Sequence, residues 1–274
     1  MTFVKIFFVI GIVIYIGYAV AVYFYPHLFL YHPDIKRPTV IQMVQKLPSV
    51  QEVSLSKISD AYGWYVASPK AQKAIVFFHG NSDNAYAFVN RVEPFVRAGY
   101  TVLMLEYQGF GGRKGKPSQS ALETDAKLAV DYLNKQGFSN KQIVLYGHSM
   151  GTYVAVYTAA VMGQKSPFLG VILESPFVNL VKVADKRSFH LYPTRFILRG
   201  NTFDTDKYIG RIKSPVFIGH GMQDKTVPYE QGEHLFEMAN TPKQFFSSEE
   251  ATHRSLPAYG FLTQALKFID ENNI

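Results

Sequence analysis

The motif G-H-S-M-G at residues 147–151 constrains the fold of this chain more than any other feature. A β-branched apolar run ends at Tyr146 just before it, and an apolar run with the composition of a buried helix follows it. A strand that turns into a helix at one residue strains the backbone there, and Gly147 and Gly151 are small enough to let the two elements approach closely. The motif therefore predicts that Ser149 presents its hydroxyl as a nucleophile.

A G-x-S-x-G motif is by itself weak evidence, because a serine that caps a helix between two turn glycines has the same pattern. A serine nucleophile needs a base and an acid, and at this kind of turn the acid and then a histidine follow the serine in chain order. Asp224 lies in a turn just after a strand predicted over residues 214–221, and His253 lies in the last loop before the C-terminal helix. Ser149, Asp224 and His253 are therefore the candidate nucleophile, acid and base.

Other histidines compete with His253 for the role of base. His220 ends a predicted strand, where a structural histidine that hydrogen-bonds to loop backbone is the more common case. His148 is next to the serine but is expected to project in a different direction from the turn. Four further histidines lie beside the apolar N-terminal segment, in a variable stretch or on a helix: His27, His32, His190 and His234. We therefore assign the base to His253.

The chemistry also requires donors for the oxygen that becomes negative in the tetrahedral intermediate, each typically worth about 10²- to 10³-fold in rate. The backbone amide of Met150, at the N-terminus of the predicted helix, is one candidate. A second donor should follow an early apolar strand, and residues 73–78 form such a run, ending in a His-Gly turn before Asn81. We predict the Asn81 amide as that donor; the alternative is that Asn81 or Ser82 caps a helix.

Residues 6–25 carry no charged side chain, and twenty helical residues extend about 30 Å, the thickness of a bilayer's hydrocarbon core. This segment is therefore predicted to be a transmembrane helix. The alternative is a signal peptide cleaved after the small residues at 19–21, which would leave an exposed apolar tail. Tyr23, Tyr25 and Tyr31 match an aromatic belt at a membrane interface instead.

The expected organisation is an N-terminal anchor over residues 1–31, a tether over 32–52 and a catalytic domain over 53–274. Strand-like and helix-like runs alternate in the third part, which predicts an α/β domain with a mostly parallel, eight-stranded sheet and helices on both faces. A small cap is expected at about 178–213. The charges near the two ends of the anchor are too few to orient it, so the side of the membrane on which the catalytic domain lies stays open.

Two local patterns add detail to the catalytic domain. Tyr62, Trp64 and Val66 alternate with other residues in the way that is typical of a strand, and we expect this early strand to be antiparallel. Ser120 and Glu123 have the spacing of a capping box, which predicts that they open a helix running to about residue 134.

The formal net charge of +7 raises the question of a nucleic-acid partner, but no basic helix or aromatic platform accompanies it, so no nucleic-acid binding is predicted. Anionic headgroups at a membrane surface are one explanation of the charge, and a solvated basic face is the other. The basic residues in question lie mostly in the expected cap: Lys182, Lys186, Arg187, Arg195 and Arg199.

The chain has no cysteine, which excludes disulfides, a thiol nucleophile and cysteine-ligated zinc. No metal or cofactor is predicted, and the oligomeric state is left open.

These motifs together resemble those of the membrane-anchored α/β-hydrolases, a group that includes bud-emergence-related hydrolases, depalmitoylase-type α/β-hydrolase-domain proteins and bacterial relatives classed with serine aminopeptidases. The resemblance implies the α/β-hydrolase fold and the triad named above, with Asn81 and Met150 at the oxyanion hole. Gln108 and Arg113 depart from the arginine and serine that the group usually carries, which leaves the substrate open. The matching segments span most of the chain: residues 78–81, 105–111, 115–118, 147–151, 174–177, 221–224 and 251–253.

The short cap predicts an open pocket, and an open site beside a bilayer suits acyl chains presented from the membrane. We therefore predict hydrolysis of carboxylic esters or thioesters with lipophilic acyl groups through an acyl-enzyme on Ser149. Haloalkane and epoxide hydrolysis on this fold generally use an aspartate nucleophile, so the serine argues against both. The alternatives are a peptidase of the same fold and a membrane-tethered scaffold without turnover.

Overall fold

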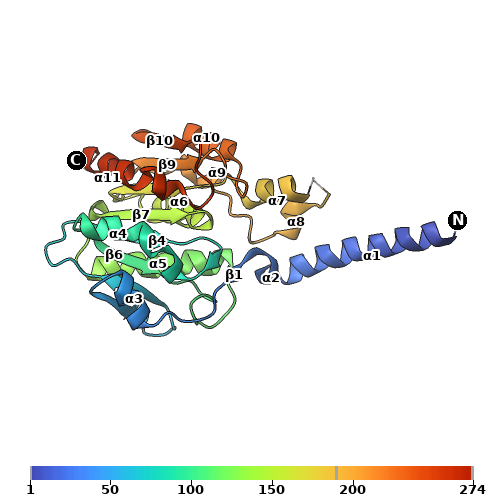
Figure 1. The fold of residues 1–274 in the computed structure, drawn as a ribbon, viewed down its shortest axis with the longest axis horizontal. Coiled ribbons are helices and arrows are strands. Elements are labelled where there is room, and N and C mark those ends of the chain that lie inside the picture. The colour runs from blue at the N-terminus through green and yellow to red at the C-terminus, as the bar shows by residue number, and fades with distance from the viewer. Residues whose placement is uncertain (1, 189–190, 273–274) are drawn as a thin grey trace.

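A central sheet of eight strands organises the part of the chain described by this computed structural model, residues 2–188 and 191–272 (Figure 1). The strand order is β10-β9-β8-β7-β4-β6-β3-β2, and all neighbours are parallel except the pairs β2–β3 and β3–β6. The predicted mostly parallel sheet with an early antiparallel strand is thus confirmed. The strands are Val50–Ser54 (β2), Tyr62–Val66 (β3), Ala74–Phe78 (β4), Thr101–Leu105 (β6), Ile143–His148 (β7), Gly170–Glu174 (β8), Val216–Gly221 (β9) and Lys243–Ser248 (β10).

Helices cover both faces of this sheet, and each face has its own apolar core. Parallel strands covered on both faces are continuously apolar, and every residue of β4 and of β7 is buried. One face carries Gln119–Lys135 (α5), Met150–Met162 (α6), Asp206–Ile209 (α9) and Tyr229–Met238 (α10). The other face carries Val89–Arg97 (α4) and Phe261–Glu271 (α11), and Val40–Lys46 (α3) packs beside β2. Three short 3-10 turns are Ala85–Phe88 (η1), Asn140–Gln142 (η2) and Leu256–Tyr259 (η3).

The N-terminus of α5 differs from the sequence prediction. Its N-cap is Ser118, whose side chain accepts a hydrogen bond from the Ala121 amide, so the expected capping box at Ser120 is wrong. Glu123 is committed elsewhere: it accepts a hydrogen bond from the hydroxyl of Tyr153 on α6, at 2.7 Å. The carboxylate that would have completed the capping box therefore bonds to α6 instead.

The segment over residues 32–52 is ordered along the domain. His32–Pro33 (β1) pairs in parallel with Ser82–Asp83 (β5), α3 follows, and β2 begins at Val50. The N-cap of α3 is Thr39, which forms a capping box with Gln42. The chain that leaves the N-terminal helix is thus hydrogen-bonded to the loop after β4 before it enters the sheet.

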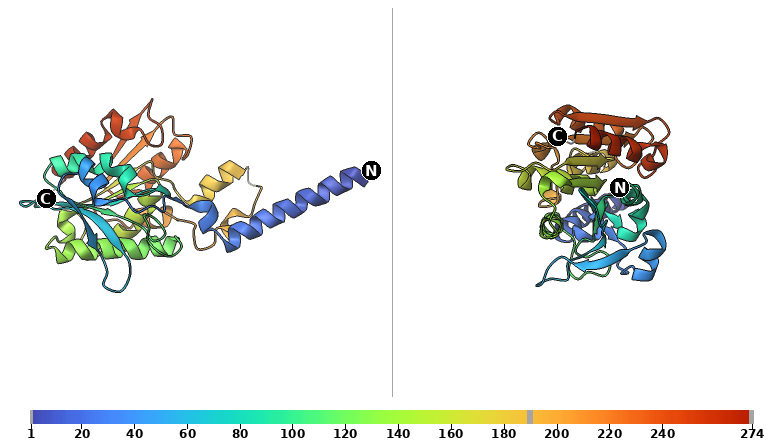
Figure 2. Two further views of the ribbon diagram at one scale, coloured as in Figure 1. Left: turned by 60° about the horizontal axis from the view of Figure 1, so that its bottom comes forward. Right: turned by 90° about the vertical axis from the view of Figure 1, so that its left-hand side faces the viewer.

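The N-terminal helix Thr2–Phe24 (α1) projects from one end of the domain, and the short helix His27–Leu30 (α2) joins it to β1 (Figures 1 and 2). The span Phe3–Phe24 has a mean hydropathy of 2.4 and is almost wholly exposed. By length and composition it is able to cross a membrane, although a signal sequence near an N-terminus meets the same criteria. An exposed apolar surface of this size requires a partner, and the bilayer is taken up below as part of the proposed function.

The segment between β8 and β9 contains Leu180–Ser188 (α7) and Thr194–Ile197 (α8), and it packs against α1. The Tyr15 and Tyr192 rings are stacked 4.5 Å apart, and the Tyr23 and Phe196 rings are stacked 5.3 Å apart. Val22 of α1 is buried in a cluster with residues of α8. This segment with α7 and α8, called the cap below, therefore packs against the N-terminal helix. His190 and the side chain of Arg187 lie outside the described part of the chain.

Candidate active site

Ser149 lies at a sharp turn between β7 and α6. Its backbone has φ +53° and ψ −119°, a left-handed geometry that residues other than glycine rarely adopt. A Cβ on Gly147 would lie 2.2 Å from the Gly151 carbonyl oxygen, and a Cβ on Gly151 would lie 2.0 Å from the Phe78 carbonyl oxygen. Any larger residue at either position would collide with backbone, so both glycines are required for the turn that presents Ser149.

The three predicted side chains meet at the carboxyl end of the sheet, where ligands of open α/β sheets generally bind. His253 Nε2 lies 2.9 Å from Ser149 Oγ, and His253 Nδ1 lies 2.7 Å from Asp224 Oδ2. Asp224 follows β9, and His253 follows β10. Ser149 is 8% exposed and the His253 side chain 14% exposed, so the group is shielded but open to a substrate on one side. This arrangement allows a proton to pass from the hydroxyl to the imidazole.

Asp224 is held in its ionised form by hydrogen bonds. Burial by itself would raise the pKa of the Asp224 carboxyl, but hydrogen bonds from His220 and His253 outweigh it and hold the pKa well below the ordinary value. Its second oxygen, Oδ1, accepts hydrogen bonds from the amides of Thr226 and Val227, each at 2.8 Å. A carboxylate with this many donors has a fixed position as well as a fixed charge.

His220, the competing histidine, is fully buried on the far side of Asp224. Its Nε2 lies 3.1 Å from the Val227 carbonyl oxygen and 3.2 Å from Asp224 Oδ2. A Cβ on Gly232 would lie 2.4 Å from its ring, so α10 packs directly against it. Within residues 2–188 and 191–272 no hydrogen bond joins His220 to Ser149. His220 therefore holds the loop that carries Asp224 in place.

The two predicted oxyanion donors lie on either side of Ser149. Met150 begins α6, so its amide is at the positive end of the helix. Gly80 packs so closely on the turn that a Cβ there would lie 3.4 Å from Ser149 Cβ, which brings the next residue, Asn81, beside the serine. In the described chain, neither the Met150 amide nor the Asn81 amide donates to another residue. The Asn81 carbonyl and side chain are used instead to bind the chain leaving α2, by hydrogen bonds with His32 N and Leu30 O.

Two residues that sequence reasoning left without a role hold the His253 loop. His148 Nε2 lies 3.2 Å from the His253 carbonyl oxygen, and Ser175 Oγ donates to the same oxygen at 3.2 Å. Burial lowers the pKa of His148 well below its ordinary value, and the nearby charge of Arg91 lowers it further. His148 is therefore neutral, and its Nε2–H donates to the His253 loop.

A buried ion pair lies beneath the turn. Arg91 on α4 donates two hydrogen bonds, each 2.9 Å long, to the carboxylate of Glu174 at the end of β8. Arg91 also donates to the Arg254 carbonyl oxygen at 3.0 Å, next to His253, while the Tyr146 hydroxyl donates to Glu174. The signal for this pair was present in the sequence: a charged residue ends an apolar strand, and another lies on the apolar face of a helix.

The described residues contain no group of three His, Asp or Glu side chains arranged to hold a metal ion.

The family described as serine aminopeptidase, S33, matches residues 69–200 of this chain. Human protein ABHD12B is 31% identical over 232 residues, which cover 76% of this chain and 64% of ABHD12B, so the chain spans less than two thirds of that relative. The YfhR protein of Escherichia coli strain K12 is 26% identical over 257 residues, which cover 90% of this chain and 85% of YfhR. Human alpha/beta hydrolase domain-containing protein 17B is 27% identical over 208 residues, 73% of this chain and 67% of that protein.

Solved structures share the fold at lower identity. The Pyrococcus furiosus esterase Pf2001 superposes with a TM-score of 0.72 at 19% identity, covering 88% of this chain and 98% of the esterase. The Thermogutta terrifontis esterase Est2 superposes with a TM-score of 0.65 at 20% identity, covering 82% of this chain and 94% of Est2. The expected fold is confirmed by these similarities.

Proposed function

We propose that this chain, which belongs to the α/β-hydrolase superfamily, is a membrane-anchored serine hydrolase that cleaves carboxylic esters or thioesters of lipophilic acyl groups. One observation carries the catalytic part of the proposal: the continuous hydrogen-bonded path from Ser149 Oγ through the His253 ring to Asp224. A hydroxyl, an imidazole and an ionised carboxylate in this order are the groups that a serine nucleophile needs.

In the first half of the reaction, Ser149 Oγ attacks the carbonyl carbon of the substrate and its proton moves to His253 Nε2. Asp224 accepts the hydrogen bond from His253 Nδ1, which selects the tautomer with a free Nε2 and stabilises the imidazolium as it forms. When the tetrahedral intermediate collapses, the bond to the alcohol or thiol breaks and His253 gives its proton to that leaving group. The acyl group remains as an ester of Ser149.

In the second half, water attacks the acyl-enzyme and passes a proton to the same His253 Nε2, and the acid product leaves as Ser149 recovers its proton. In both halves the carbonyl oxygen becomes negative. The amides of Asn81 and Met150, which have no partner in the described chain, are the proposed donors to it. The hydrogen bonds that fix Asn81 to the chain leaving α2 support this role, because a donor that is already oriented needs no rearrangement during the reaction.

The apolar character of α1 and the cap supports lipophilic substrates and an anchor over residues 1–31. A signal peptide cleaved after residue 21 would remove Tyr15 and leave Tyr192 of the cap without the ring that stacks on it. The proposed small cap, at about 178–213, packs against α1 through α8. A scaffold without turnover would not require the contacts that join Ser149, His253 and Asp224. The peptidase alternative is supported only by the description of the matching family, serine aminopeptidase.

The test is hydrolysis by the full chain in detergent micelles. We expect Ser149-dependent hydrolysis of p-nitrophenyl esters or acyl-CoA thioesters, with higher kcat/KM for long acyl chains than for acetyl, and loss of activity in Ser149→Ala. Aminoacyl p-nitroanilides serve as the comparison set. Faster hydrolysis of these amides than of every ester and thioester would replace the proposal with a peptidase, and a preference for acetyl would contradict the lipophilic substrate.

A further inference from the structure

An apolar groove lies between α1 and the cap, with a volume of about 570 Å³. We call it the α1–cap groove. Its volume is within the range of small-molecule binding sites. The residues that define its course are Ile14, Tyr18 and Val22 of α1, Phe29 of α2, Leu198 next to α8, and Asn81. One wall of the groove is therefore the N-terminal helix itself.

Asn81 links the groove to the candidate active site. Asn81, which lines it, is the proposed oxyanion donor, and the preceding residue, Gly80, packs against Ser149. The Asn81 side chain donates to the Leu30 carbonyl oxygen, and Leu30 also lines the groove. An acyl group bonded to Ser149 Oγ, with its carbonyl oxygen at Asn81, thus has the mouth of the groove beside it.

From this mouth the groove follows α1 away from the sheet. Val22, Tyr18 and Ile14 are four residues apart, so they lie on one side of the helix at steps of about 6 Å, and Ile14 lies about 12 Å beyond Val22. The cap accompanies α1 along this distance, because Tyr192 stacks on Tyr15. The far end of the groove is consequently beside the exposed apolar surface of α1, where a bilayer would surround it.

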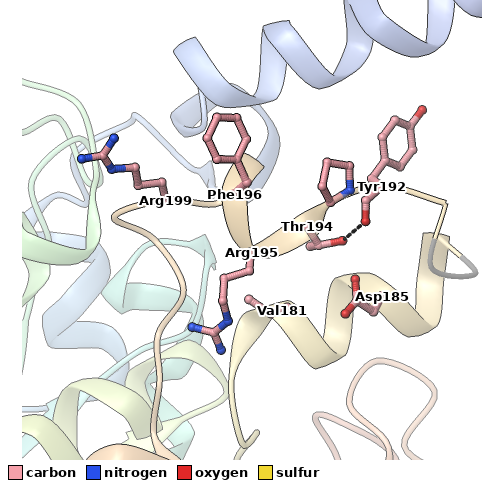
Figure 3. Close-up of a pocket in the computed structure, with 8 residues that line it drawn as sticks. Val181, Asp185, Tyr192, Thr194, Arg195, Phe196 and Arg199 are labelled. Atoms are coloured by element: carbon pink, nitrogen blue, oxygen red, sulfur yellow. Dashed lines mark hydrogen bonds between the residues drawn. The ribbon is translucent and has the colours of Figure 1, made fainter.

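The two sides of α8 differ in chemistry. Figure 3 shows the rings of Tyr192 and Phe196 on the side of α8 toward α1 and the Arg195 side chain on the side toward α7. All three residues line a second, open hollow of about 720 Å³ between α7 and α8. Arg195 is paired there with Asp204 at 3.3 Å. Among the described residues, no Lys, Arg, Asp or Glu side chain lines the α1–cap groove, and most of the lining residues are apolar or aromatic, which suits a hydrocarbon chain.

We propose that the α1–cap groove binds the acyl chain of the substrate, so that the membrane anchor is one wall of the substrate site. The chain enters from the bilayer along α1 and reaches Ser149 with its carbonyl end first. This inference rests on the proposed serine hydrolysis. It predicts that a bulky side chain on α1 excludes shorter acyl chains the nearer its position lies to the mouth of the groove.

The test fills the groove at two depths and compares full-length variants in micelles on p-nitrophenyl butyrate, decanoate and palmitate. Val22→Trp, near the mouth, should lower the palmitate-to-butyrate and decanoate-to-butyrate ratios of kcat/KM by at least about tenfold. Ile14→Trp, farther along α1, should lower the palmitate ratio while its decanoate ratio falls less. Val20→Trp is the matched control, because Val20 is exposed on another side of α1 and does not line the groove.

The outcomes separate the inference from the function on which it rests. Absence of Ser149-dependent hydrolysis of every ester in the wild type would overturn the proposed function itself. Hydrolysis that depends on Ser149, but with the same ratios in Val22→Trp, Ile14→Trp and Val20→Trp, would overturn the groove and leave the function standing. Labelling of each Trp variant at Ser149 with a fluorophosphonate, together with a wild-type melting temperature in the same micelles, shows that the variant is folded.

Discussion

The carboxyl end of the sheet and the α1–cap region are built by different kinds of contact. Around Ser149, hydrogen bonds, a buried ion pair and two obligatory glycines fix each group. Between α1 and the cap, stacked aromatic rings and a small apolar cluster hold the elements together. Polar contacts within the protein fix the geometry of the first region, whereas the second presents an exposed apolar surface that the proposed bilayer would cover. Chemistry and substrate choice are therefore assigned to separate parts of the molecule.

The largest expected effects are on the rate, and they belong to the polar region. Removal of Ser149 in Ser149→Ala should lower kcat by about 10⁶-fold, and Asp224→Asn should lower it by about 10⁴-fold because the His253 tautomer is no longer selected. Ser149→Ala should keep the wild-type melting temperature within a few degrees. Steady-state kinetics on a long-chain ester, together with thermal unfolding, would measure this. If His220→Ala loses activity to the same extent and His253→Ala does not, the base has been assigned to the wrong histidine.

The buried ion pair should dominate the stability of the same region. Arg91→Ala leaves the Glu174 carboxylate buried without its partner, so we expect a loss of about 3–5 kcal/mol in the free energy of unfolding. Arg97→Ala is the matched control on the same helix, since the exposed Arg97–Glu93 pair should contribute less than about 1 kcal/mol. Urea unfolding of the two variants checks the difference. Equal losses would mean that the pair beneath the turn is not structurally important.

Glycines give the most direct contrast between the two regions. A Cβ on Gly151 would meet backbone at 2.0 Å, so Gly151→Ala should cost about 3 kcal/mol or more, because backbone must move to admit it. Gly17 of α1 has no atom within 4 Å of the same Cβ position, so Gly17→Ala should cost nothing. The measurement is the melting temperature of each variant in the same detergent. A tolerated Gly151→Ala would contradict the close packing of the turn.

The smallest expected effect is on the pH dependence of stability. The pKa of Asp224 is lower in the folded protein than in the unfolded chain, so its contribution is fully present above the ordinary aspartate value of 3.8 and declines as the pH falls below it. The stability difference between wild type and Asp224→Asn should therefore be constant from neutral pH to about 5 and shrink under more acidic conditions. Unfolding curves at several pH values test this. A difference that grows below pH 4 would show that the carboxyl is not stabilised in its charged form.

The features that could be predicted from the sequence are those that depend on short segments of the chain. The turn at Ser149 is a local feature. The chain order was enough to choose His253, which contacts Ser149, and Asp224, which contacts His253. The fold followed from alternating strand and helix runs. These features depend on short segments and on a fixed order of elements.

Contacts between distant segments were not predictable in this way. Arg91 and Glu174 are separated by 83 positions, and nothing in either segment identifies the other as its partner. The same is true of Tyr15 and Tyr192, which only the packed structure brings together. At α5 the capping-box spacing indicated Ser120, but Ser118 is the N-cap and Glu123 accepts a hydrogen bond from Tyr153 instead. Side-chain partners decided each of these cases.

The central claim is that Ser149 is a nucleophile activated by His253, and covalent labelling tests it most directly. The full chain in micelles is treated with a fluorescent fluorophosphonate, and the site of modification is located by peptide mass spectrometry. The account predicts rapid labelling of the wild type at Ser149, no labelling of Ser149→Ala, and strongly slowed labelling of His253→Ala. Folded wild-type protein that resists the probe, or equal labelling of wild type and Ser149→Ala, would contradict it.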